Sequence, residues 1–270
     1  MEISTDKTSP ILVFDSGAGG ISVLRELVKQ LPCEDFIFFG DSANAPYGTK
    51  DMDTVRQLTI SHVERYLERG VKAVCVACNT ATSAAVAALR RMYPELPLVG
   101  IEPAIKPAAE AYPGGNIIVL ATPMTVALPK FNGLLERYKD VAHITPVAAP
   151  GLMEFVERGE ITGPALESFL TDLVAPYKGN VDGAVLGCTH YPFIAPVLKK
   201  VLGDVSIFDG SEGTARQMRR SLEAAGLLND AGLHNADGPH CSSTPAGRIT
   251  YECSSPDPDH IKVFEKLFNI

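Results

Sequence analysis

Short, wholly apolar runs recur along this chain and alternate with amphipathic stretches. Strands that are apolar on both faces are typical of parallel sheets covered by helices. The amphipathic stretches between them carry apolar residues at helical spacing, as in Leu166, Phe169, Leu170, Leu173 and Val174. The pattern therefore predicts an α/β fold. The expected strands cover residues 11–14, 36–39, 73–77, 98–101, 117–121, 142–147, 183–186 and 205–208.

A similar pattern of polar and glycine residues follows the strands in each half of the chain. Each half opens on a strand that ends in polar or glycine-rich sequence, FDSGAGG from Phe14 and LATPMTV from Leu120. The third strand of each half ends in a cysteine with polar residues after it, Asn-Thr after Cys78 and Thr-His after Cys188. We therefore expect two similar domains, each a parallel sheet of about four strands flanked by helices.

The domain limits follow from the positions of the prolines and from the tail. Pro103 and Pro107 mark a boundary, so we assign residues 1–102 to the first domain and 103–209 to the second. Residues 210–270 are expected to return to the first domain. They would form a helix at 211–225, a loop at 233–247, an edge strand at 248–253 and a last helix at 259–268.

Composition limits which kinds of partner the protein can bind and indicates its cellular compartment. A net charge of −8 and a pI of about 5.3 disfavour nucleic acid or an anionic membrane as partner. The first ten residues lack the apolar segment of a signal peptide, and no apolar run reaches the roughly 18 residues of a spanning helix. The scattered cysteines belong to a chain too long to need disulfides. We therefore expect free thiols and a cytoplasmic protein.

Polar segments stand where ligands bind in parallel sheets, beyond the carboxyl ends of the strands. If the two halves face each other, these segments line one cleft between the domains, which is where we expect the active site. The segments are Asp15-Ser16-Gly17, 40–48, Cys78-Asn79-Thr80, 122–125 and Cys188-Thr189-His190.

Two of the cysteines are the strongest candidates for chemistry. A free cysteine is most often a small buried apolar side chain, and we expect this of the other four. Cys78 and Cys188 instead stand where a strand gives way to a helix, whose N-terminal dipole should lower the thiol pKa and favour thiolate. Two such thiols suit proton transfer on opposite faces of one carbon, where one accepts a proton and the other donates one.

Three other ionisable residues have both a structural and a chemical interpretation. Asp15 can cap the helix that follows it, or act as an acid/base partner of a thiol. His190 can cap or pack, or poise the thiol of Cys188 as Cys–His pairs do. Glu157 is most simply a solvated charge on a helix. Spacing alone leaves these alternatives open.

No motif calls for a cofactor or a metal. DSGAGG does not complete the dinucleotide fingerprint, because Ser22 stands where G-x-G-x-x-G needs its last glycine. We instead expect the glycines to let backbone N–H groups reach a carboxylate at a helix start. The histidines and cysteines of the tail, among them His234, His240 and Cys241, match no paired zinc-ligand spacing. We therefore expect no metal site and no cofactor.

Four motifs in this order, DSGAGG, GDSANAPYG, CNTATSAA and GCTHYP, resemble the motif set of the bacterial glutamate racemase family. The resemblance covers about residues 11–208, and Thr-His-Tyr-Pro favours glutamate over aspartate racemases. It implies two α/β domains with the active site between them. It also implies cofactor-independent inversion of glutamate at Cα, which supplies D-glutamate for peptidoglycan. The oligomeric state stays open, a homodimer included.

The resemblance also implies roles for the matching residues. Cys78 would take the proton from D-glutamate and Cys188 from L-glutamate, with Asp15 assisting the first thiol and His190 the second. Glu157, in VERG, aligns with a further acidic helper. The residues expected to hold the substrate are Asp15, Ser16, Tyr47, Gly48, Cys78, Asn79, Thr80, Thr122, Thr125, Cys188, Thr189 and His190.

Two alternatives to this function remain. One is a racemase or isomerase of the same superfamily that acts on another acid. The other is a non-catalytic protein that binds or senses an amino acid in the same cleft, which the intact cysteine pair disfavours. Because an amino-acid Cα–H is a weak acid, a racemase must aim hydrogen-bond donors at the α-carboxylate to stabilise the developing charge.

Overall fold

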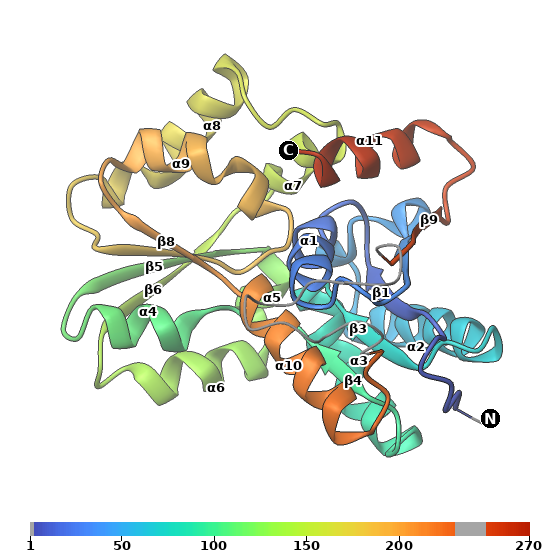
Figure 1. The fold of residues 1–270 in the computed structure, drawn as a ribbon. Coiled ribbons are helices and arrows are strands. Elements are labelled where there is room, and N and C mark those ends of the chain that lie inside the picture. The colour runs from blue at the N-terminus through green and yellow to red at the C-terminus, as the bar shows by residue number, and fades with distance from the viewer. Residues whose placement is uncertain (1–2, 230–246) are drawn as a thin grey trace.

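Two parallel sheets form the framework of the molecule, as the computed structural model shows for residues 3–229 and 247–270 (Figure 1). The first sheet has the strand order β4-β3-β1-β2-β9. Its strands are β1 (Ile11–Asp15), β2 (Phe36–Gly40), β3 (Ala73–Val76), β4 (Leu98–Gly100) and β9 (Ile249–Cys253). The second sheet has the order β6-β5-β7-β8. Its strands are β5 (Asn116–Ala121), β6 (His143–Ala148), β7 (Gly183–Leu186) and β8 (Ser206–Asp209).

Helices cover both faces of each sheet, which confirms the α/β class. The helices of the first half are α1 (Ile21–Gln30), α2 (Met52–Glu68), α3 (Asn79–Met92), α10 (Ser211–Ala224) and α11 (Asp259–Phe268). Those of the second half are α4 (Ile105–Ala111), α5 (Pro123–Ala127), α6 (Pro129–Tyr138), α7 (Leu152–Glu157), α8 (Pro164–Val174) and α9 (Ala195–Leu202). Four 3₁₀ turns complete the described elements: η1 (Ser42–Asn44), η2 (Tyr47–Thr49), η3 (Ala175–Tyr177) and η4 (Tyr191–Ile194).

Alternation along the buried strands divides the core of the first half. In β1, Leu12 and Phe14 pack with residues of α2 and α3. Ile11 and Val13 point to the other face and pack with residues of α1, α10 and α11. Successive strand side chains point to opposite faces, so a strand covered on both sides needs apolar residues at every position. This explains why the strands could be found as continuous apolar runs.

The tail returns to the first sheet. Strand β9 pairs with β2, and α10 packs against α1. Among the described residues, the first sheet therefore has five strands where about four were expected, because the expected edge strand joins it. The expected last helix is confirmed at Asp259–Phe268, whereas most of the expected loop at 233–247 lies outside the described residues. The domain limits at 102 and 210 stay a prediction, which the pairing of β9 supports. Over the described ranges, no helix has the length and apolar character needed to cross a membrane.

Candidate active site

A small cavity lies where the carboxyl ends of the two sheets meet. It is bordered by the residues that follow β1, β3, β5 and β7, and by the turn η2. Every residue expected to hold the substrate lines this cavity except Asp15, which is fully buried and does not line it. The lining residues are Ser16, Tyr47, Gly48, Cys78, Asn79, Thr80, Thr122, Thr125, Met153, Gly187, Cys188, Thr189 and His190.

Cys78 is the N-cap of helix α3, two residues after the end of β3. Its sulfur accepts a hydrogen bond from the Ala81 N–H at 3.4 Å, and its thiol donates to the Ser16 hydroxyl at 3.4 Å. Burial and the nearby charge of Asp15 raise the pKa of Cys78 to about 12. The expectation that the helix dipole lowers this pKa is therefore wrong. Loss of hydration on burial outweighs one backbone donor, and the thiol is the resting form.

Asp15 is fully buried where β1 ends, and it joins the two halves. Its Oδ2 accepts the Gly17 N–H at 3.0 Å, and its Oδ1 accepts the Thr189 hydroxyl at 3.2 Å. Burial raises the pKa of Asp15 to about 6, against the opposing charge of His190. Helix α1 begins after Gly20 without a side-chain cap, so the capping interpretation of Asp15 is wrong. A carboxyl that titrates near neutral pH is suited to proton exchange.

Cys188, His190 and Glu157 form a chain of contacts on the other side of the cavity. The sulfur of Cys188 lies 3.6 Å from His190 Nδ1, and His190 Nε2 lies 2.6 Å from Glu157 Oε1. Burial would lower the pKa of His190, but its contacts with Cys188 and Glu157 raise that pKa well above its usual range. Burial would raise the pKa of Glu157, but the contact with His190 lowers it.

These pKa directions favour a charged imidazolium that donates to both neighbours. The Gly19 N–H also lies 3.2 Å from His190 Nε2, so this nitrogen cannot satisfy both Gly19 and Glu157. We assign the proton to Nε2, because its contact with Glu157 is shorter and charge-assisted. Glu157 is therefore not the solvated helix charge of the simplest interpretation, since its side chain is only 17% exposed.

The glycines of DSGAGG allow this approach between the halves. A Cβ on Gly17 would lie 2.1 Å from Glu157 Oε1, and a Cβ on Gly19 would lie 2.3 Å from His190 Nδ1. Larger residues would therefore push both side chains away. The Ala18 N–H of this segment donates to Glu157 at 2.7 Å, so one of these backbone groups contacts a carboxylate of the protein itself.

Hydroxyl and amide groups line the rest of the cavity. The Thr80 hydroxyl lies 3.3 Å from that of Thr125 and 3.5 Å from that of Thr122. The Thr122 hydroxyl donates to that of Thr125 at 2.9 Å. The Oδ1 atom of Asn79 is buried and has no hydrogen-bond partner among the described residues. A buried acceptor without a donor costs free energy, so this atom is suited to a donor on a bound ligand.

Two lining residues had not been expected. Gly187 directly precedes Cys188, and a Cβ there would lie 2.9 Å from the Leu120 carbonyl oxygen. The Gly-Cys pair at a strand end was a usable signal for it. Met153 comes from α7, and nothing in its sequence context marked it. In the described part of the chain, no three His, Cys, Asp or Glu side chains are grouped to hold a metal ion. His234, His240 and Cys241 lie outside that part.

Comparisons with known proteins agree on one family. The model of the Asp/Glu/hydantoin racemase family matches residues 11–218. Glutamate racemase of Clostridium novyi (strain NT) is 54% identical over 222 residues, which cover 82% of this chain and 86% of that one. Glutamate racemase of Clostridium botulinum (strain Hall) is 44% identical over 263 residues, with 97% of each chain covered. The crystal structure of glutamate racemase from Thermus thermophilus in complex with beta-chloro-D-alanine has a TM-score of 0.77 at 34% identity. The match covers 98% of this chain and 95% of that one.

Proposed function

Because this chain belongs to the Asp/Glu/hydantoin racemase family, we propose that it interconverts L-glutamate and D-glutamate by proton transfer at Cα, without a cofactor. The observation that carries this proposal is the pair of thiols, Cys78 and Cys188, which border one cavity from opposite halves of the molecule. One thiol on each side of a carbon can remove its proton from one face and return a proton to the other. The D-glutamate formed would supply peptidoglycan synthesis.

The proposed reaction balances without an oxidant or a co-reactant. With D-glutamate bound, the Cα–H bond breaks and its proton forms the S–H bond of Cys78. The electron pair remains on Cα and is delocalised into the α-carboxylate. The S–H bond of Cys188 then breaks and its proton bonds to the opposite face of Cα, which inverts the configuration. L-Glutamate uses the same two thiols in reverse order.

Two different settings would prepare the thiols for these roles. Cys78 and Asp15 repel each other when both are ionised, so in this proposal they share one negative charge. The ammonium group of bound glutamate would favour the thiolate of Cys78, whose S–H bond breaks as its proton moves to the carboxylate of Asp15. The thiolate is therefore formed when substrate is present. Cys188 has the imidazolium of His190 beside it, and Glu157 holds that imidazolium in place.

The remaining lining residues are proposed to hold the substrate. The unpartnered Oδ1 of Asn79 suits the ammonium group. The hydroxyls of Thr80, Thr122 and Thr125 suit a carboxylate, because each can turn its proton toward it. Donors aimed at the α-carboxylate would stabilise the charge that develops as Cα loses its proton.

Compartment and partners are also proposals. We propose that the enzyme works in the cytoplasm, which the free thiols of Cys75, Cys78, Cys188 and Cys253 support, because disulfides are rare in reducing compartments. The net charge of −8 supports the absence of a nucleic-acid partner. A homodimer stays a prediction.

Isotope exchange tests the proposed reaction directly. The purified protein is incubated with L-glutamate in D₂O without added cofactor, and the enantiomers are separated and weighed by mass spectrometry. We expect D-glutamate with deuterium at Cα. Absence of both exchange and inversion would contradict the proposal. Binding of glutamate without exchange would favour a sensing protein, and exchange with another acid alone would favour a related racemase.

The matched variants for this test are Cys78→Ala and Cys75→Ala. Both thiols are buried and lie three residues apart, but Cys75 sits within β3 and does not line the cavity. We expect Cys78→Ala to lose racemisation and Cys75→Ala to keep it. Equal activity in the two variants would refute the role of Cys78.

A further inference from the structure

Asp41 is a buried carboxylate beside the cavity that none of the roles above uses. It follows β2 and is 0% exposed, and it is not among the residues that line the cavity. Its Oδ2 accepts the Tyr47 hydroxyl at 2.6 Å and lies 3.2 Å from His62 Nε2. The Asn44 side-chain amide donates to both of its oxygens, at 3.0 and 3.1 Å. Asp41 therefore gathers contacts around one carboxylate from the side chains of Tyr47, His62, Asn44 and Ser254.

The carboxylate of Asp41 is ionised in this setting. Burial would raise its pKa, but the surrounding donors, His62 first among them, lower it below its usual value. A buried carboxylate is tolerated when its oxygens are satisfied by several hydrogen bonds. Its contacts are therefore charge-assisted and directional, which makes the group able to fix the orientation of its partners.

Tyr47 connects Asp41 to the cavity. The Tyr47 side chain is 1% exposed, and its ring centroid lies 6.4 Å from that of Phe14 in the core. Because its hydroxyl proton is donated to Asp41, the hydroxyl does not offer that proton to a ligand. The next residue, Gly48, packs against the opposite half, since a Cβ there would lie 3.0 Å from the Cβ of Thr122. A displacement of Tyr47 would therefore move this wall of the cavity.

We propose that Asp41 is a positioning residue that holds Tyr47 and Gly48 against the bound substrate and thereby determines how tightly the site binds glutamate. This inference rests on the proposed function and assigns part of its substrate affinity to a residue outside the cavity. Asp41 touches neither thiol in the described contacts, so its effect falls on binding and not on proton transfer. Asn44 and His62 share the same carboxylate but do not line the cavity, which makes them suitable for comparison.

Steady-state kinetics of Asp41→Asn, Tyr47→Phe and the double variant test the proposal in both directions of racemisation. A hydrogen bond to a charged group is worth about tenfold or more in an equilibrium constant. We expect each single variant to raise KM about five- to tenfold and to change kcat less than about twofold, the signature of lost binding shared by ground and transition states. We expect the double variant to resemble Asp41→Asn within about twofold, because both changes act on the same Tyr47–Asp41 hydrogen bond.

The control is Asn44→Ala, which removes two hydrogen bonds to Asp41 and leaves the Tyr47 contact in place. We expect its KM to stay within about twofold of wild type. Tyr47→Phe keeps the ring in the core, so it tests the proposal even if Asp41→Asn folds poorly. An unchanged KM in Tyr47→Phe, or effects of the two single variants that multiply in the double variant, would overturn the positioning role alone. Absence of turnover in the wild type would overturn the proposed function and this inference with it.

Discussion

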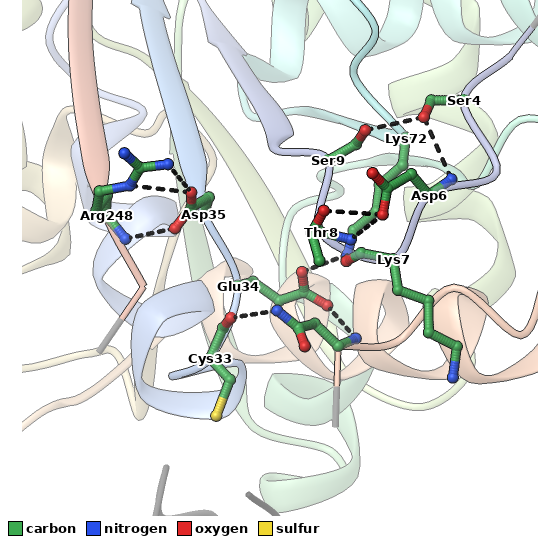
Figure 2. A network of polar contacts seen from close by, with 11 residues as sticks. Ser4, Asp6, Lys7, Thr8, Ser9, Cys33, Glu34, Asp35, Lys72 and Arg248 are labelled. Carbon is green, nitrogen blue, oxygen red and sulfur yellow. Dashed lines mark hydrogen bonds and ion pairs between the residues drawn. The ribbon is translucent and has the colours of Figure 1, made fainter. Parts of the chain in front are cut away.

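The two ends of the first sheet both bury charged groups, but only one end pairs them completely. At the amino ends of the strands, Glu34 and Lys72 are 1% and 0% exposed and form an ion pair of 2.5 Å (Figure 2). Lys72 also donates to the Lys7 carbonyl oxygen, and Glu34 Oε1 accepts the Asn229 N–H at 2.9 Å. The oxygens of Glu34 are thus satisfied within the protein.

At the carboxyl ends, buried groups remain unbalanced. Asp15 has its pKa raised to about 6, and Cys78 has its pKa raised to about 12. Asn79 Oδ1 has no partner in the described part of the chain. A charged group whose partners all lie within the protein helps to fix a single folded structure. A buried group that lacks a partner can instead bind a ligand or exchange a proton. The comparison predicts that substitutions at the two ends will have different effects.

The largest expected effect is on stability, at the paired end. Lys72→Met keeps the length of the side chain and leaves the carboxylate of Glu34 buried without its cation. We expect the free energy of unfolding in urea to fall by about 3–5 kcal/mol, the cost of breaking a buried pair. Burial already raises the pKa of Glu34, and loss of its cation would raise that pKa further. The loss of stability should therefore be greater at pH 8 than at pH 5. The activity of the folded fraction should stay within about twofold of wild type.

The matched control for Lys72→Met is the double variant Lys72→Met/Glu34→Gln. Glutamine keeps an acceptor for the Asn229 N–H but carries no charge. Most of the lost stability should return, because replacing both charges of a buried pair is often nearly neutral. If the double variant is as unstable as the single one, the lost free energy of unfolding comes from packing and not from the unpaired charge. The proposed difference between the two ends of the sheet would then be wrong.

The fold could be predicted because parallel strands covered on both faces leave a continuous apolar run in the sequence. The runs at β1, β5 and β7 were found within one residue of their observed bounds. The position of the site was also predictable, because the carboxyl ends of parallel strands share one edge of a sheet. That edge placed Cys78 and Thr122 at one cavity before any contact was known.

The pKa values and the contacts of Glu157 could not be derived from local sequence. The high pKa of Cys78 arises from burial between two halves, which a single strand and helix start does not reveal. Glu157 contacts the Ala18 N–H across 139 positions of chain. On its own helix it has only the spacing of a surface residue, and family resemblance was the one signal that singled it out.

The next largest effect is a gain of stability at the unbalanced end. Asp15→Asn removes a carboxyl whose pKa is raised to about 6 by burial. A raised folded pKa means that ionisation opposes folding, with no effect below the unfolded pKa of about 3.9 and a full effect above 6. We expect Asp15→Asn to be about 2–3 kcal/mol more stable than wild type at pH 8 and equal to it near pH 4, while racemisation falls. Urea unfolding at both pH values measures this.

Asp35→Asn is the control of opposite sign, at the amino end of β2. Burial would raise the pKa of Asp35, but hydrogen bonds from Arg248 lower it. A lowered pKa gives stability above the unfolded pKa and loses it as pH falls. Asp35→Asn should therefore be less stable than wild type at pH 8 and similar to it near pH 3. If both variants change the stability at pH 8 in the same direction, the proposed difference between the two ends would be contradicted.

The smallest expected effect is on the pH dependence of activity. Glu157→Gln removes the carboxylate that holds the imidazolium of His190, so the pKa of His190 should fall toward its usual range. We expect kcat/KM to drop about tenfold near pH 8. It should drop equally for both enantiomers, because they have equal free energy in water. The fall of activity at high pH should begin at a lower pH than in the wild type. Full pH profiles in both directions measure this.

Glu154→Gln provides the comparison for that variant within α7. Glu154 does not line the cavity, and one of its oxygens is buried without a hydrogen-bond partner among the described residues. Both substitutions remove one negative charge from the same helix, so a general electrostatic effect would shift both pH profiles alike. A shift in Glu157→Gln alone would assign the pKa of His190 to the 2.6 Å contact. It would also show that the His190–Glu157 contact acts on the thiol of Cys188 beside it.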